Sequence, residues 1–243
     1  MSDAHRLNSR GLRLAARGRA GRGPIIVFLP GYMSDMEGGK ATALDAWAAT
    51  EGRAMLRFDY GGCGGSEGEF EHQSLADWRD DTLAAIDSVE GPVLLVGSSM
   101  GGWLMLLAAL ARPERVVGLI GVAAAPDFTS WGFTDEQKAT IRDEGRLAED
   151  SPYGDAPYVT TRTFWDSGEQ LKLLGGEVAI VCPVRLLHGL EDEDVPWRVS
   201  LDLLHRLRSP NVQATLIKGG DHRLSRPGDI ALLIAAVRHM LAP

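Results

Sequence analysis

The stretch VLLVGSSMGGWLMLLAAL, residues 93–110, decides the fold of this chain. Residues 93–96 are a short apolar run with valine at both ends, which predicts a buried strand. Residues 100–111 are rich in leucine, alanine and methionine, which favour helices, and this run ends before Arg112-Pro113. The chain is therefore predicted to pass from a strand directly into a helix.

Gly97-Ser98-Ser99-Met100-Gly101 lies at this junction and has the pattern G-x-S-x-G around Ser99. Glycines at the flanks let the strand and the helix approach each other, because they carry no Cβ. The hydroxyl of Ser99 is then exposed at the carboxyl end of the strand, as in a nucleophile elbow. Ser98 is the weaker candidate because glycines do not flank it symmetrically. The alternative is a glycine-rich turn with a solvated serine.

The composition of the chain limits which classes of protein it can belong to. The chain has 243 residues, of which 44% are hydrophobic and 24% charged, as expected for one α/β domain, or for one domain with an insertion. The net charge of −8 argues against nucleic acid or an anionic membrane as partner. No apolar run reaches about 18 residues, so we expect no membrane span. Cys63 and Cys182 lack metal-like spacing, so we expect reduced thiols and no metal site.

The first 23 residues hold six arginines and a single acidic residue, Asp3. An arginine-rich, acid-poor start is typical of mitochondrial transit peptides. Leu7, Leu12 and Leu14 with Gly11 and Gly18 equally suit an edge β-hairpin whose arginines face water, and we favour the hairpin.

Strands and helices alternate along most of the chain. Strands are predicted at 24–29, 53–59, 93–97, 116–122, 182–189 and 212–217, and helices at 35–50, 74–89, 100–111, 195–207 and 229–241. Ser74 and Asp77 suit a capping box at the start of the second helix. This alternation predicts an α/β fold with a mostly parallel sheet flanked by helices.

Residues 127–177 interrupt the alternation. They show weaker periodicity, with a predicted helix at 134–146 and a β pair around 158–164. A connection this long inside an α/β domain is usually functional, so we predict a cap inserted into a core of 1–126 and 178–243. The alternative is a packed surface insertion with no role in substrate binding.

A serine hydroxyl needs a base to take its proton, and the base needs a third group to fix its tautomer. His222 follows the last predicted strand on the glycine-containing loop 218–222, where it can reach over the elbow, so we predict it as the base. His188 ends a strand and is expected to make a structural loop contact. The acid must come from residues 191–194, four adjacent carboxylates among which periodicity cannot choose.

His188-Gly189-x-x-Asp192-x-x-Val195-Pro196 resembles the acid loop of α/β hydrolases, and the resemblance extends over residues 24–243. It implies the α/β-hydrolase fold and makes Asp192 the acid, with Asp194 as reserve. In this fold the amide after the nucleophile, that of Met100, is one donor to an oxyanion. The amide of Tyr32 is the second. Many relatives have His-Gly before that residue, where this chain has Pro30-Gly31, and the role of the amide is unaffected.

Residues 28–34, 57–61, 65–66 and 97–123 are similar to the α/β-hydrolase domain protein ten family, which is mitochondrial in animals and has bacterial relatives. The resemblance implies removal of palmitoyl groups from S-acyl cysteines and hydrolysis of acyl glucuronides. It also implies a cytoplasmic location in a bacterium, or a mitochondrial one in a eukaryote.

The predicted activity is cofactor-free hydrolysis of acyl esters or thioesters by Ser99, His222 and Asp192. The predicted partner is a small or acylated substrate; the oligomeric state is not predicted. Apolar residues expected to form an acyl pocket are Met33, Trp131, Phe133, Phe164 and Trp165, together with Met100 and Trp103, although Trp103 also suits the core. One alternative is a prolyl or aminopeptidase-like hydrolase that binds a free amine through Glu144, Glu149 and Asp150. The other is a non-catalytic relative that binds a ligand.

Overall fold

The computed structural model describes residues 3–150 and 157–242. Its strands are β1 (Asp3–Ser9), β2 (Leu12–Arg19), β3 (Arg22–Leu29), β4 (Arg53–Phe58), β5 (Val93–Ser98), β6 (Val116–Val122), β7 (Arg146–Glu149), β8 (Tyr158–Thr161), β9 (Val184–Gly189) and β10 (Val212–Ile217). Its helices are α1 (Gly39–Thr50), the 3-10 turn η1 (Phe70–His72), α2 (Leu75–Asp87), α3 (Met100–Ala111), α4 (Phe128–Trp131), α5 (Asp135–Glu144), α6 (Arg162–Gln170), α7 (Arg198–Arg206) and α8 (Pro227–Met240).

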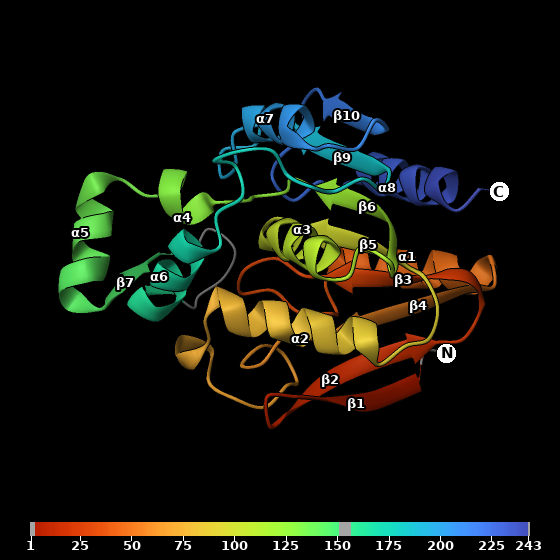
Figure 1. The fold of residues 1–243 in the computed structure, drawn as a ribbon, viewed down its shortest axis with the longest axis horizontal. Helices are drawn as coiled ribbons and strands as arrows, with labels where there is room; N and C mark the ends of the chain where they lie inside the picture. The colour runs from red at the N-terminus through yellow and green to blue at the C-terminus, as the bar shows by residue number, and fades with distance from the viewer. Residues whose placement is uncertain (1–2, 151–156, 243) are drawn as a thin grey trace.

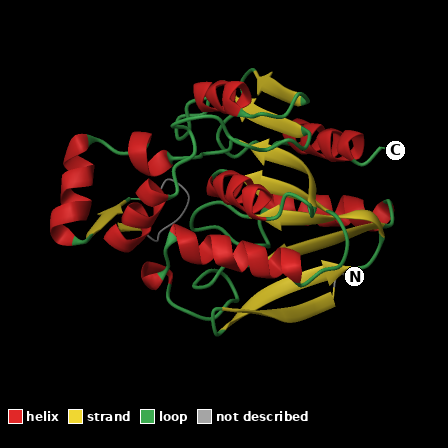
Figure 2. Ribbon diagram, in the orientation of Figure 1, coloured by secondary structure: helices red, strands yellow, loops and turns green. Residues whose placement is uncertain are grey.

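Eight strands form one sheet in the order β1-β2-β4-β3-β5-β6-β9-β10. The six strands from β4 to β10 in this order pair in parallel, whereas β1–β2 and β2–β4 pair in antiparallel fashion. Figures 1 and 2 show helices on both faces of this sheet. The predicted α/β fold with a mostly parallel sheet is confirmed. In such sheets ligands bind at the carboxyl ends of the strands, where Ser99 follows β5.

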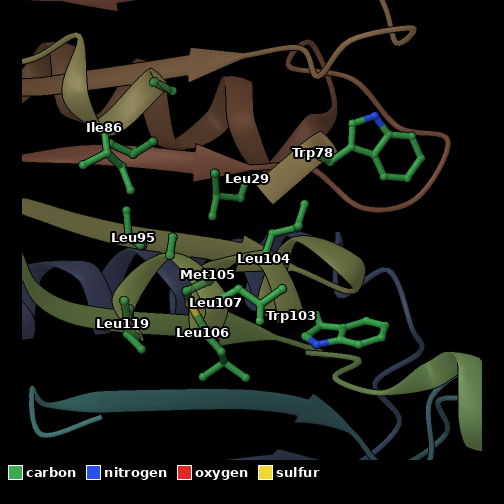
Figure 3. Packing of buried hydrophobic residues seen from close by; sticks show 14 of the residues in the cluster. Leu29, Trp78, Ile86, Leu95, Trp103, Leu104, Met105, Leu106, Leu107 and Leu119 are labelled. Carbon is green, nitrogen blue, oxygen red and sulfur yellow. The ribbon is translucent and has the colours of Figure 1, made fainter. Parts of the chain in front are cut away.

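Two apolar clusters cover the two faces of the sheet. One packs Val27, Leu29 and Leu95 against residues of α2 and α3, and Figure 3 shows Trp78 and Trp103 within it. The other packs the opposite faces of β3 and β5 against α1 and α8. Because β3 and β5 are covered on both sides, their sequences are continuous apolar runs.

The predicted N-terminal hairpin is confirmed, since β1 and β2 pair and β2 joins the sheet beside β4. Arg6, Arg10, Arg13 and Arg22 are exposed to water, as expected, but four of the six arginines also form ion pairs, which were not expected. Arg10, at the hairpin turn, donates to Asp77 and Asp81 of α2. Other arginines of β2 pair with acids of the neighbouring loops and helices, namely Glu67, Glu37 and Asp45. These contacts fix the hairpin against the core.

The inserted segment between β6 and β9 contains α4, α5, α6 and the two-stranded sheet of β7 and β8. In Figure 1 these elements lie to the left of the main sheet. The predicted β pair at 158–164 is only partly correct. The side chain of Thr161 accepts from the amide of Phe164 and begins α6 there, so the strand ends at Thr161. Its partner is β7, because Gly145 adopts a left-handed φ of 82° and ends α5 before it.

Other predicted boundaries differ slightly. The first helix begins at Gly39 rather than residue 35, because the chain turns at 35–38, where the amide of Gly38 donates to the carbonyl of Asp35. The capping box of Ser74 and Asp77 at α2 is confirmed. No helix within residues 3–150 and 157–242 is long and apolar enough to cross a membrane.

Candidate active site

Ser99 lies between β5 and α3 with φ 54° and ψ −121°, a backbone conformation that residues other than glycine rarely adopt. The neighbouring glycines have no room for a side chain. A Cβ on Gly97 would lie 2.3 Å from the carbonyl oxygen of Gly101, and one on Gly101 would lie 2.1 Å from that of Leu29. This packing holds the sharp turn that presents the Ser99 hydroxyl.

His222 lies on the loop after β10 and contacts the Ser99 side chain. Its Nε2 is 3.1 Å from Oγ of Ser99, and its Nδ1 is 2.9 Å from Oδ2 of Asp192. These three residues, predicted from three separate parts of the sequence, therefore form one chain of hydrogen bonds. With Nδ1 donating to the carboxylate, Nε2 is left free to accept the serine proton.

Asp192 has a fully buried side chain in the loop after β9. Its Oδ1 accepts from the amides of Asp194 and Val195, and its Oδ2 accepts from His222. Burial alone raises the pKa of Asp192, but hydrogen bonds from His188, His222 and Val195 outweigh it and hold the pKa well below the usual range. Asp192 is therefore an anion near neutral pH. This contact with His222 fits the prediction of Asp192 as the acid.

His188 contacts the side chain of Asp192 directly, in addition to the loop contact expected from the sequence. The ring is fully buried, with Nε2 3.1 Å from Oδ2 of Asp192 and 2.9 Å from the carbonyl oxygen of Val195. Nδ1 lies 2.7 Å from Oγ of Ser200 in α7. Its place directly before Gly189, four residues from the acid, was the only sequence signal for this contact.

Two backbone amides lie next to the serine. The loop after β3 approaches so closely that a Cβ on Gly31 would be 3.4 Å from Cβ of Ser99. Among the hydrogen bonds between described residues, neither the amide of Tyr32 nor that of Met100 has an acceptor. Met100 also begins α3, where the helix dipole favours negative charge. The pair can therefore donate to an oxyanion formed at the serine.

The phenol of Tyr32 ties this loop to the inserted segment. It is buried and donates to the carbonyl of Val159 in β8, while the phenol of Tyr158 donates to the carbonyl of Tyr32. Burial raises the pKa of Tyr32 far above its usual value, so it stays a neutral donor.

Two cavities meet at Ser99 and share Tyr32, Tyr158 and His222 in their walls. The first, of about 290 Å³, is lined by Met33, Lys40, Arg223 and residues of the loop after β3. The second, of about 310 Å³, is lined by aromatic residues of the insertion and by three acids, Glu149, Asp150 and Asp194. The serine thus faces one cationic and one aromatic, acidic compartment.

The predicted apolar residues fall into three groups. Trp131 and Phe133 line the second cavity, and Met33 lines the first. Phe164, Trp165, Met100 and Trp103 line neither of these cavities. Phe164 and Trp103 are buried in the core, because the apolar faces of α6 and α3 pack inward. The indole of Trp165 donates to the carbonyl of Thr129, which joins α6 to α4.

Asp192, Asp194 and His222 bring ligand-type atoms within 4.8 Å of one another. Both oxygens of Asp192 already accept hydrogen bonds, and His222 is engaged at both ring nitrogens. These nitrogen and oxygen atoms therefore already take part in the hydrogen-bond chain of the site.

The chain belongs to the alpha/beta hydrolase family, whose model matches residues 26–240. It is similar to the rat (Rattus norvegicus) protein named palmitoyl-protein thioesterase ABHD10, mitochondrial, with 42% identity over 233 residues, 94% of this chain and 78% of the relative. The solved structure of alpha/beta hydrolase domain-containing protein 10 from mouse has a TM-score of 0.91 at 40% identity and covers 98% of both chains. A putative hydrolase from Agrobacterium vitis S4 has a TM-score of 0.92 at 35% identity, covering 100% of this chain and 99% of the other.

Proposed function

We propose that this protein is a cofactor-free serine hydrolase that cleaves acyl esters or thioesters. The observation that carries the proposal is the hydrogen-bond chain from Ser99 through His222 to Asp192, beside two amides that have no acceptor among the described residues. The 42% identity to a protein named palmitoyl-protein thioesterase supports an acylated thiol as substrate. An intact chain of this kind argues against a relative that only binds a ligand.

In the proposed mechanism, Oγ of Ser99 attacks the acyl carbonyl while Nε2 of His222 takes its proton. The carbonyl oxygen becomes an oxyanion and accepts from the amides of Tyr32 and Met100. The bond to the leaving oxygen or sulfur then breaks, and His222 returns the proton to that atom. Water, activated by the same ring, hydrolyses the acyl-enzyme and releases the carboxylic acid. Asp192 stabilises the imidazolium that forms in each half of the reaction.

The aromatic residues of the insertion favour placing the acyl group in the second cavity, between Trp131 and Phe133. Apolar walls stabilise an acyl chain by about 0.8 kcal/mol for each buried CH₂. In this proposal residues 127–177 act as a cap that completes the pocket, with Tyr32 and Tyr158 coupling the cap to the oxyanion loop.

A second candidate is the aminopeptidase-like hydrolase. Glu149 and Asp150 line the second cavity, as that alternative requires, although Glu144 does not. A free ammonium group would be attracted to these carboxylates and to the aromatic faces.

A substrate panel distinguishes the two candidates. Acyl thioesters of increasing chain length and matched aminoacyl amides should be compared for kcat/KM, with fluorophosphonate labelling as a check for an active serine. We expect thioesters to be turned over at least about 100-fold faster, since the thiolate leaves more easily than an amine and a long acyl chain fills the apolar pocket more completely than an aminoacyl side chain. A preference for aminoacyl amides would establish the second candidate instead.

Hydrolysis of acyl glucuronides, the other activity implied by the family resemblance, needs a place for a carboxylate on the leaving group. The first cavity offers Lys40 and Arg223, with Asp35 as the one carboxylate among the described lining residues. Burial, followed by the nearby charge of Arg223, lowers the pKa of Lys40 to about 8. The carboxylates of Asp221 and Asp229 offset part of this effect, and an anionic leaving group would add to their attraction for the Lys40 ammonium.

Lys40→Met should therefore lower the preference for anionic leaving groups. With octanoyl thioesters of 3-mercaptopropionate and of its neutral amide, we expect the ratio of kcat/KM values to fall about tenfold, as for loss of one partly buried charge contact. In the wild type the ratio should fall as the pH rises through about 8, because Lys40 then loses its proton. Lys172→Met, at an exposed lysine in neither cavity, is the control. An unchanged ratio in Lys40→Met would exclude this use of the cavity.

The compartment remains a prediction. Relatives such as the rat protein carry "mitochondrial" in their names, which fits the expectation for a eukaryotic source. The expectation for a bacterial source is the cytoplasm.

A further inference from the structure

His188 is a buried titratable residue that the mechanism above does not use. It lies at the end of β9, a strand held between β6 and β10, and its ring is fully buried. Asp192 lies on the loop that follows, before α7 begins at Arg198. The ring thus stands between a fixed strand and the loop that carries the acid.

The partners of the ring determine its tautomer. Nε2 faces the carbonyl oxygen of Val195 at 2.9 Å and Oδ2 of Asp192 at 3.1 Å, which can only accept. Nε2 therefore carries a hydrogen, which is shared between these two oxygens. Nδ1 then suits the hydroxyl of Ser200, 2.7 Å away, as its donor.

This contact completes the environment of the acid. The amides of Asp194 and Val195 hold Oδ1, while His222 and His188 approach Oδ2 from two sides. The two amides belong to the loop between β9 and α7, whereas His188 belongs to the sheet. Groups that contact a catalytic carboxylate in this way fix its orientation toward the base.

We propose that His188 is a positioning residue, whose Nε2–H bridges Asp192 and Val195 and so fixes the carboxylate against His222. This inference depends on the proposed function, since it assigns His188 a role through the catalytic acid. Hydrogen bonding from His188 also helps to hold the pKa of Asp192 low. The substrate does not touch His188, whose ring is fully buried.

His188→Gln and His188→Asn test the proposal as a matched pair. The glutamine amide can place its N–H near the position of Nε2, whereas the shorter asparagine reaches only toward Ser200. We expect His188→Asn to lower kcat about 10- to 100-fold with KM within about twofold, as for loss of other groups that orient a reacting ligand. His188→Gln should retain kcat to within about threefold, since a neutral hydrogen bond is replaced by another.

The pH profile separates positioning from packing. Without the His188 donor, more charge remains on the Asp192 carboxylate, which stabilises the imidazolium form of His222. The acid limb of kcat/KM should therefore move to higher pH in His188→Asn and stay in place in His188→Gln. Ser200→Ala, which removes the anchor at Nδ1 and keeps the ring, should give a smaller shift in the same direction. Thr82→Val removes a buried hydrogen bond to Trp78 elsewhere and should lower only the thermal stability.

Three results would overturn the proposal. These are equal kcat values in the asparagine and glutamine variants, an unmoved acid limb in a folded His188→Asn, or loss of activity that follows the melting temperature alone. If His188→Asn does not fold, Ser200→Ala with wild-type kcat and an unmoved limb overturns it. The low-field proton resonance of the His222–Asp192 bond provides a readout without substrate. A wild type that shows this resonance, shifted in His188→Asn, but hydrolyses no ester would refute the proposed function and leave the inference about His188 supported.

Discussion

Ser99→Ala should lose hydrolytic activity almost completely, with kcat falling roughly 10⁵- to 10⁶-fold, as when other triad nucleophiles are removed. Without Oγ no acyl-enzyme forms, and only the two amides and the binding cavities remain to favour attack by water. The measurement is turnover of an octanoyl thioester together with fluorophosphonate labelling. Labelling should disappear with activity, because both need the same oxygen.

Ser98→Ala is the matched control for this experiment. Ser98 is the last residue of β5, is mostly buried, and directly precedes Ser99. We expect its activity to stay within a few-fold of wild type and its labelling to persist. Equal labelling of wild type and Ser99→Ala would refute the assignment of Ser99. The reverse pattern would move the nucleophile to Ser98.

Asp192→Asn should lower kcat by about 10⁴-fold with little change in KM, which is the cost of the wrong histidine tautomer in such a triad. The asparagine amide would donate to Nδ1 of His222 and so place the ring hydrogen on Nε2, facing Ser99. The ring then cannot take the serine proton. Stopped-flow measurement of acyl-enzyme formation isolates this step from substrate binding.

Asp194→Asn is the comparison for the acid. Asp194 lies in the same loop and lines the second cavity, and its amide rather than its side chain bonds to Asp192. We expect activity within about tenfold of wild type, since an exposed charge near His222 contributes only modestly to the stability of its imidazolium form. A large loss in Asp194→Asn with a mild effect in Asp192→Asn would transfer the role of acid to Asp194. Because the pKa of Asp192 lies well below its usual range, its protonation does not cause a loss of activity in mild acid.

The elbow could be predicted because its determinants are local. A β-branched run, closely spaced glycines and a helix-forming run specify a strand, a tight turn and a helix in consecutive residues, and the structure has these elements at β5 and α3. The alternation of strands and helices specified the parallel sheet for the same reason. The hairpin was predicted as well. The ion pairs of its arginines were not, since their acid partners lie up to 71 residues away in sequence.

The insertion shows where local patterns fail. Aromatic residues alone did not reveal which of them face a cavity, because helix orientation depends on what each face packs against. Phe164 and Trp165 are neighbours in α6, yet one is buried in the core and the other bonds to α4. Trp131 and Phe133 line the second cavity.

The sequence by itself determined the fold and led to the prediction of Ser99 as nucleophile and His222 as base, because strand and helix patterns are local and the order of the elements decides which loops meet. Only the tertiary structure brought Asp192 within 2.9 Å of His222, with His188 against the same carboxylate oxygen. Only it divided the space around Ser99 into a cationic and an aromatic cavity. These features depend on distances between side chains from separate loops, and packing of the whole chain sets those distances.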